Sequence, residues 1–200
     1  MDVKKDIFGQ LDKICKPGAI LASNTSYLDI NEIASATSRP EDVIGLHFFS
    51  PANLMRLLEV VVADKTAPEV VATGFALAKK MKKVGVRAGV CDGFIGNRIL
   101  SHYRAAADGM VLAGASPFQI DRAMKDFGFA MGPYEGADLA GLDIGYMTRQ
   151  RKAADRHPRD VVPTWADALF NKGRLGQKTG RGYYVYEDRK GTPDPEAEAL

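Results

Sequence analysis

The sequence of 200 residues changes its hydrophobic periodicity near residue 91, and this change most constrains how the chain can fold. Before it, short apolar runs of strand length alternate with segments whose apolar residues recur at helical spacing. Such alternation is typical of a layered α/β sheet. The expected helices cover 3–15, 28–36 and a segment opened by a capping box of Thr66 and Glu69. The expected strands cover 19–22, 43–49, 57–62 and 84–90.

After residue 91, helical periodicity dominates and few strand patterns remain. A second capping box, Ser116 with Gln119, opens a helix that should end near Gly128, because glycine readily adopts the left-handed backbone of a helix end. The other expected helices cover 94–112, 134–154 with a break or kink at Gly136 and Gly141, and 164–171. A turn and a short aromatic strand are expected at 180–186, followed by a loose tail at 191–200. The sequence thus predicts an α/β part followed by a mostly helical part.

The composition excludes several classes of protein. Lys and Arg number 27 against 25 Asp and Glu, and a net charge of +2 argues against a dedicated nucleic-acid-binding protein. No apolar run approaches the ~18 residues of a membrane-spanning helix, and no apolar signal core follows Met1. Cys15 and Cys91 make neither a disulfide framework nor a zinc site, and the three histidines lack metal-ligand spacing. We therefore expect no membrane partner, no metal and a reducing, cytoplasmic location.

His47 lies inside an apolar strand pattern and is the strongest candidate for chemistry. Imidazole suits proton transfer near neutral pH, although a core histidine bonded to a backbone carbonyl has the same pattern. Glu59 is the only charged residue of 57–62, and a carboxylate buried without a partner is costly. Glu59 could pair with either of two residues. His47 would form a proton-transfer dyad with it, whereas Arg56 would form an ion pair with it at the strand end.

Other polar positions have both a functional and a structural interpretation. Residues 24–26 end the first strand, where open α/β sheets place ligands, but they could equally cap the next helix. Asn97 follows two closely spaced glycines, which permit close approach of a ligand or of another helix. Lys178 lies in a glycine-rich loop and could reach a phosphate or a carbonyl, or stay solvated. No Gly-x-Gly-x-x-Gly turn follows a strand, and no Gly-Lys-Ser/Thr phosphate loop is present.

Seven motifs, taken in order along the chain, resemble those of the 3-hydroxyacyl-CoA dehydrogenases. They are ASNTS at 22–26, GLHFFSPA at 45–52, EVV at 59–61, DGFIGNR at 92–98, MGPYE at 131–135, GLD at 141–143 and KTGRGYY at 178–184. Each motif alone is weak, but the ordered set is specific, and the resemblance covers nearly all of residues 1–186.

The resemblance implies an enzyme that oxidises L-3-hydroxyacyl-CoA to 3-ketoacyl-CoA with NAD in fatty-acid β-oxidation. It implies the C-terminal part of a Rossmann-like NAD-binding domain at 1–91, and at 92–200 a helical dehydrogenase domain through which a homodimer would form. His47 matches the catalytic base of the family and Glu59 the carboxylate that orients it. The positions that match substrate-binding residues are Ser26 and Asn97, and those that match residues around the nicotinamide and the catalytic cleft are Lys4, Asn24 and Lys178.

The chain also departs from the family. Members begin with a strand and a Gly-rich pyrophosphate turn well before the position of Met1, so we expect a part of a longer protein that is inactive by itself. Ser50, where single-function members usually have Asn, resembles the multifunctional β-oxidation proteins, whereas Asn53 is less usual there. Two other interpretations stay open: a helical association module that has lost cofactor binding, and a dehydrogenase of small hydroxy acids, which commonly uses Lys as its base.

Overall fold

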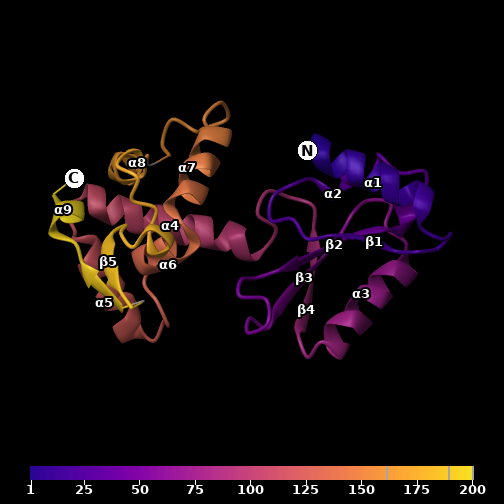
Figure 1. The fold of residues 1–200 in the computed structure, drawn as a ribbon, viewed down its shortest axis with the longest axis horizontal. Coiled ribbons are helices and arrows are strands. Elements are labelled where there is room, and N and C mark those ends of the chain that lie inside the picture. The colour runs from indigo at the N-terminus through magenta and orange to yellow at the C-terminus, as the bar shows by residue number, and fades with distance from the viewer. Residues whose placement is uncertain (161, 189, 200) are drawn as a thin grey trace. The chain divides into compact units, whose positions relative to one another are not determined.

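The computed structural model of the chain describes residues 1–160, 162–188 and 190–199. It divides into two compact units, Met1–Leu100 (unit 1) and Ser101–Leu200 (unit 2) (Figure 1). The division by compactness falls inside a long helix, α4 (Gly96–Leu112), whose first turn belongs to unit 1. The domain boundary near residue 91 stays a prediction from the sequence.

Unit 1 holds a mixed sheet. In the described residues its strand order is β1 (Leu21–Ser23), β2 (Val43–Phe48), β3 (Leu57–Val62) and β4 (Val84–Gly89). The pairs β1–β2 and β3–β4 are parallel, whereas β2 and β3 are antiparallel. The α/β class is confirmed, and each predicted strand is present, although β1 begins later than predicted.

Helices cover both faces of this sheet. Figure 1 shows α1 (Asp2–Ile14) and α2 (Ile30–Ala34) on one face and α3 (Pro68–Lys80) on the other, and a short 3-10 helix, Pro40–Asp42, leads into β2. Because side chains alternate along a strand, Val43 and Val61 join the apolar cluster of α1 and α2. Their neighbours Ile44, Leu46, Leu58 and Val60 join the cluster under α3. By the same alternation, His47 and Glu59 share the face of Val43 and Val61.

Both predicted capping boxes are wrong. The N-cap of α3 is Ala67, and the Thr66 hydroxyl instead donates to the Val43 carbonyl at 2.7 Å and accepts the Ala63 N–H at 3.0 Å. A strand carbonyl brought close by the tertiary fold therefore takes the hydroxyl that the local pattern assigned to the helix. Ser116 is the N-cap of α5, but its side chain makes no capping hydrogen bond.

Unit 2 is mostly helical, as predicted. After α4 its helices are α5 (Pro117–Phe127), α6 (Pro133–Ala140), α7 (Leu142–Arg151) and α8 (Thr164–Asn171), followed by a 3-10 turn, Gln177–Thr179. The break expected at Gly141 within 134–154 is confirmed: α6 and α7 are separate helices, because Gly141 takes a φ of +102° and ends the first of them. Gly136 causes no break, whereas α5 ends at left-handed Gly128 as expected.

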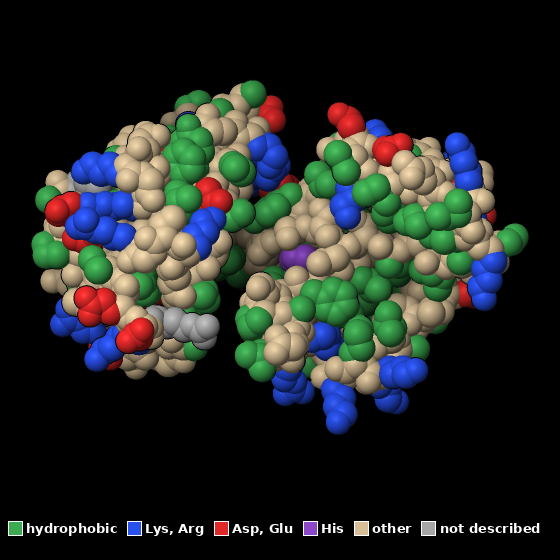
Figure 2. All heavy atoms as spheres, in the orientation of Figure 1, with side chains coloured by type: hydrophobic (Ala, Val, Ile, Leu, Met, Phe, Trp, Pro, Cys, Tyr) green, Lys and Arg blue, Asp and Glu red, His purple; other side chains and the backbone are tan. Residues whose placement is uncertain are grey.

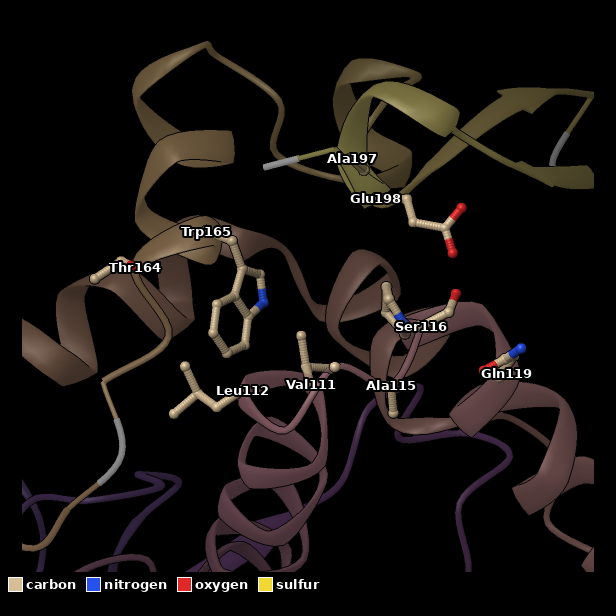
Figure 3. Close-up of a pocket in the computed structure, with 11 residues that line it drawn as sticks. Val111, Leu112, Ala115, Ser116, Gln119, Thr164, Trp165, Ala197 and Glu198 are labelled. Atoms are coloured by element: carbon tan, nitrogen blue, oxygen red, sulfur yellow. The ribbon is translucent and has the colours of Figure 1, made fainter.

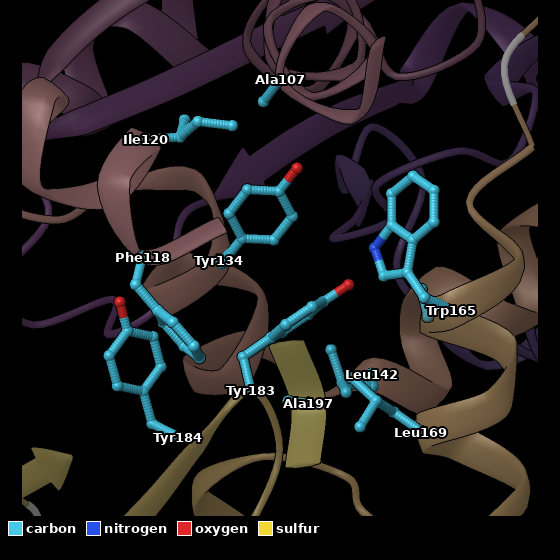
Figure 4. Close-up of a cluster of buried hydrophobic side chains, with 11 residues drawn as sticks. Ala107, Phe118, Ile120, Tyr134, Leu142, Trp165, Leu169, Tyr183, Tyr184 and Ala197 are labelled. Atoms are coloured by element: carbon cyan, nitrogen blue, oxygen red, sulfur yellow. The ribbon is translucent and has the colours of Figure 1, made fainter. Parts of the chain in front are cut away.

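Tyrosine rings form the centre of the unit 2 core. Tyr134 and Tyr183 lie 4.9 Å apart between ring centroids, with Trp165 to one side of them and Tyr184 to the other (Figure 4). Asp138 accepts the backbone N–H groups of Tyr183 and Tyr184 at 3.0 and 2.9 Å, one on each carboxylate oxygen. Burial raises the pKa of Asp138, while these donors act in the opposite direction. The tyrosines of the KTGRGYY motif are therefore bound to a buried carboxylate inside the fold.

The loose tail predicted at 191–200 is wrong for residues 191–199, and Leu200 lies outside the described residues. β5 (Tyr184–Glu187) pairs antiparallel with β6 (Lys190–Pro193), and a short helix, α9 (Pro195–Glu198), follows. Asp194 is buried and accepts hydrogen bonds from Arg174 at 3.1 Å and from Arg181 at 2.7 Å. These two arginines hold a segment whose composition alone suggested disorder.

Candidate active site

The register of β2 and β3 sets His47 directly opposite Glu59. His47 Nδ1 lies 2.7 Å from Glu59 Oε2, and the two residues are 3% and 0% exposed. The sequence left Arg56 as an alternative partner of Glu59, but Arg56 is exposed and the hydrogen bonds of Glu59 within the described chain go elsewhere. Antiparallel pairing on one sheet face therefore creates the buried imidazole–carboxylate pair.

The second oxygen of Glu59 binds the beginning of α4. The backbone N–H groups of Ile95 and Gly96 donate to Glu59 Oε1 at 3.1 and 2.7 Å. The first N–H groups of a helix have no partner within the helix, and the helix dipole favours a negative charge there. The Glu59 carboxylate is thus held by two amides on one oxygen while the other faces His47.

Two aromatic rings contact the imidazole. The ring centroid of His47 lies 4.5 Å from that of Phe49 and 5.6 Å from that of Phe94. Within the described chain, Nε2 of His47 makes no hydrogen bond, so it is left for an outside group. Neither phenylalanine is among the site residues expected from the sequence. Phe49 could have been noticed because it lies two residues after His47, on the same side of an extended chain.

Asn24 is tied to the strand that carries His47. Its side-chain Oδ1 accepts the backbone N–H of Phe48 at 3.1 Å. The next residue, Thr25, uses its hydroxyl to accept the Leu28 N–H at 3.1 Å, so this loop is ordered by its own side chains. Ser26 follows in the same loop and is half-buried. The structure therefore brings Asn24 next to the His47 strand, with Ser26 two residues farther along.

The remaining predicted site residues have different surroundings. Asn97 lies in the first turn of α4, directly after the Gly96 amide that binds Glu59. Lys4 lies on α1, and within the described residues no hydrogen bond or ion pair joins it to His47 or Glu59. Lys178 belongs to unit 2, where its ammonium group pairs with Asp143. In unit 1, Asn24 is thus connected to the pair through Phe48, which follows His47, and Asn97 through Gly96, which binds Glu59.

Unit 2 has a hollow of its own, with a volume of about 590 Å³. Figure 3 shows Trp165, Val111 and Leu112 around it, with Ser116 at the start of α5 and Glu198 of α9 at its border. None of the predicted site residues lines this hollow.

Among the described residues, no three His, Cys, Asp or Glu side chains gather in a way that could hold a metal ion. Nor does that part of the chain contain a helix long and apolar enough to cross a membrane.

Two family models match the chain in succession. The 3-hydroxyacyl-CoA dehydrogenase NAD binding domain matches residues 1–91, and the C-terminal domain of the same family matches residues 93–186. Among curated proteins, a peroxisomal bifunctional enzyme of Danio rerio is 44% identical over 98% of this chain. The alpha subunit of the fatty acid oxidation complex of Ectopseudomonas oleovorans is 40% identical over 98% of it. The chain spans only 29% and 28% of the lengths of these two relatives.

Solved structures agree with these matches. An Escherichia coli 3-hydroxybutyryl-CoA dehydrogenase superimposes with a TM-score of 0.85 at 38% identity, covering 96% of this chain and 41% of that one. The (S)-3-hydroxybutyryl-CoA dehydrogenase PaaH1 of Ralstonia eutropha also gives a TM-score of 0.85, at 34% identity, covering 94% of this chain and 68% of that one. Fold, motif order and both family models agree, and the chain therefore belongs to the 3-hydroxyacyl-CoA dehydrogenase family.

Proposed function

We propose that the chain carries the catalytic centre of an NAD-dependent L-3-hydroxyacyl-CoA dehydrogenase of fatty-acid β-oxidation. His47 is the general base and Glu59 the carboxylate that orients it. The observation that carries this proposal is the 2.7 Å contact between His47 Nδ1 and Glu59 Oε2, together with a ring Nε2 that no described residue binds. The intact pair favours this activity over a non-catalytic association module, and a histidine base favours it over a lysine-dependent dehydrogenase of small hydroxy acids.

The chemistry follows from this geometry. Oxidation of a secondary alcohol requires that the O–H proton leave as hydride departs from carbon. Neutral His47 accepts that proton at Nε2, while its Nδ1–H donates to Glu59. The Glu59 carboxylate stabilises the imidazolium that forms, and the Ile95 and Gly96 amides keep that carboxylate in place. NAD, when bound, supplies the nicotinamide ring that accepts the hydride.

The end of β1 fits the polar part of such a cofactor. The Ser23 hydroxyl is buried and has no hydrogen-bond partner in the described chain. In the next residue, Asn24, the side-chain Oδ1 accepts the Phe48 N–H, and the Nδ2 group donates to no described residue. An unpartnered hydroxyl and an amide donor at the carboxyl end of a strand suit a ligand amide or carbonyl. We assign Asn24 to the cofactor and, by the family resemblance, Lys4 and Lys178 as well.

Ser26 and Asn97 are the proposed substrate-binding residues. Both are half-buried, and neither side chain makes a hydrogen bond with a described residue. Their hydroxyl and amide groups are suited to hold the substrate hydroxyl and the thioester carbonyl of an acyl-CoA in the orientation that proton transfer needs.

We further propose that residues 1–91 and 92–200 are the two domains, and that the second forms a homodimer. Large apolar side chains of unit 2 are exposed, with Phe127 at 80%, Met147 at 61% and Leu112 at 59%. Figure 2 shows apolar side chains at the surface of both units. Exposed apolar helical faces are normally covered by a partner, most often in a twofold dimer. Light scattering on the purified chain tests this, and a monomer of 21.7 kDa would contradict it.

The location of the protein stays a prediction. Cys15 and Cys91 are free thiols, which suits a reducing compartment. The relatives include proteins named peroxisomal and proteins of bacteria, so the cytoplasm is not singled out. Their names also include bifunctional and multifunctional proteins, which agrees with the interpretation of Ser50.

The decisive experiment replaces the base in the natural full-length protein. His47→Ala should lower turnover by about 10²–10⁴, which is the usual contribution of a general base, with acyl-CoA affinity little changed. The matched control is His102→Ala, because His102 is an exposed histidine on α4. Turnover of the His47 variant at the level of the control would overturn the proposed role.

A further inference from the structure

Phe94 has a left-handed backbone in the turn before α4. Its φ is +49°, and that of Gly93 before it is +75°. Glycine adopts this region freely, but a bulky residue does so only where the surrounding packing enforces it. Phe94 is almost completely buried, and it packs in the same apolar cluster as Phe8 of α1 and Ile30 of α2. The fold therefore holds an unfavourable backbone conformation at this residue.

This turn directs the first amides of α4 at Glu59. It is closed by hydrogen bonds from the Phe94 N–H to the Cys91 carbonyl at 3.1 Å and from the Arg98 N–H to the Gly93 carbonyl at 3.1 Å. The two residues that follow Phe94 donate the N–H groups that bind Glu59 Oε1. Backbone geometry at Phe94 thus determines where the Glu59 carboxylate is held.

The Phe94 side chain contacts the other member of the pair. Its ring centroid lies 5.6 Å from that of His47, at a tilt of 58°. Phe49 adds a second contact at 4.5 Å, and it fits there because Gly96 has no side chain: a Cβ on Gly96 would lie 2.7 Å from Phe49 Cζ. One residue therefore acts on Glu59 through the main chain and on His47 through its ring.

We propose that Phe94 is a positioning residue for the His47–Glu59 pair. This inference rests on the proposed role of His47 as the general base. Phe94 carries no charge and no polar side-chain group, so it acts on the orientation of the imidazole and not on its proton. A small misplacement of a catalytic group lowers the rate of the chemical step without a matching loss of substrate affinity.

The test compares two identical substitutions in one apolar cluster, in the natural full-length protein. Phe94→Leu removes the ring that contacts His47. Phe8→Leu is the matched control, because Phe8 is 3% exposed in the same cluster, whereas within the described residues the rings that contact His47 are those of Phe49 and Phe94. We expect both to lower thermal stability, but only Phe94→Leu to lower kcat, by about ten- to hundredfold with KM nearly unchanged. Should Phe94→Leu fail to fold, Phe94→Met has an unbranched, flexible side chain that adapts better to the space left by the ring and gives the same comparison.

A second measurement reports on the pair without turnover. An imidazole Nδ1–H bonded to a carboxylate gives a far-downfield proton resonance, which broadens when the ring moves and the proton exchanges. We expect this resonance of His47 to persist in Phe8→Leu and to broaden or disappear in Phe94→Leu. If Phe94→Leu keeps both the kcat and the resonance of Phe8→Leu, Phe94 is not a positioning residue. If His47→Ala keeps turnover, the proposed function fails instead, and the NMR comparison still decides whether Phe94 positions the imidazole.

Discussion

The backbone N–H of Gly96 donates to Glu59 Oε1 at 2.7 Å, and this bond joins the first turn of α4 to the buried strand β3. It lies within unit 1 and joins the motif that begins at Asp92 to the motif that begins at Glu59. The amide fixes one carboxylate oxygen while the other faces His47 Nδ1. Two motifs that are separate along the chain are therefore in direct contact in the folded protein.

Gly96→Ala should lower turnover while changing stability little. Alanine is preferred over glycine in helices by about 1 kcal/mol, which offsets the crowding. The new Cβ would lie 2.7 Å from Phe49 Cζ, at the end of a side chain that can move, and moving it takes the ring away from His47. We expect a loss in kcat of about tenfold. Gly109→Ala in the same helix, where the new Cβ would meet open space, is the control, and equal turnover of the two variants would contradict the prediction.

Glu59→Gln should impair both the base and the fold. The amide keeps the shape of the carboxylate, but its NH₂ group cannot accept a hydrogen bond, so either His47 or the Ile95 and Gly96 amides lose an acceptor. We expect a fall in kcat of about tenfold or more, smaller than that of His47→Ala. We also expect a loss of roughly 1–3 kcal/mol in the free energy of unfolding, because buried donors are left without acceptors. Steady-state kinetics and urea unfolding measure the two effects, and unchanged values in both would remove Glu59 from the proposed mechanism.

Gly182→Ala should destabilise unit 2. A Cβ at this position would lie 2.1 Å from Asp138 Oδ1, which accepts the backbone N–H of the next residue, Tyr183. Neither the carboxylate nor the backbone can move away without breaking buried hydrogen bonds, and we expect a loss of about 1–3 kcal/mol or more. Gly136→Ala in α6 is the control, since its Cβ would meet open space. Thermal unfolding should separate the two variants, and equal midpoints would show that the Asp138 contact tolerates a side chain.

Asp194 should make the protein sensitive to acid. The hydrogen bond from Arg181 is the main reason that the pKa of Asp194 lies below its usual value, although burial acts in the opposite direction. A carboxyl whose pKa is lower in the folded state contributes stability above its unfolded pKa of about 3.9 and loses it as the pH falls through the folded pKa. The wild type should thus exceed Asp194→Asn in stability at neutral pH by roughly 1.5–3 kcal/mol, the range for hydrogen bonds to charged groups.

The measurement for this prediction is the difference in unfolding free energy between the wild type and Asp194→Asn from about pH 7 down to about pH 3. The difference should shrink as the pH falls. Asp126→Asn is the control, because Asp126 is exposed on α5. A difference that stays constant with pH would mean that ionised Asp194 does not contribute through the arginines.

The sequence by itself determined the elements that depend on side-chain pattern alone. Strands β2 and β3 and helix α8 lie where the apolar periodicity predicted them, because each buries a face that a short stretch of chain already specifies. It also indicated the centre of the site. A lone carboxylate in an apolar run requires a partner, and His47, on the strand that pairs with that run, provides it.

Only the tertiary structure decided which polar groups meet. The amides that hold Glu59 come from residues 36 and 37 positions away, and no local pattern around Glu59 indicates them. For the same reason Thr66 bonds a strand carbonyl instead of capping α3, and Arg174 and Arg181 hold Asp194 in a segment that composition alone predicted to be loose. Hydrophobic periodicity is a local property of the chain, so the sequence reports it directly. A hydrogen bond needs its donor and acceptor at short range and in line, and only the packing of distant segments establishes that.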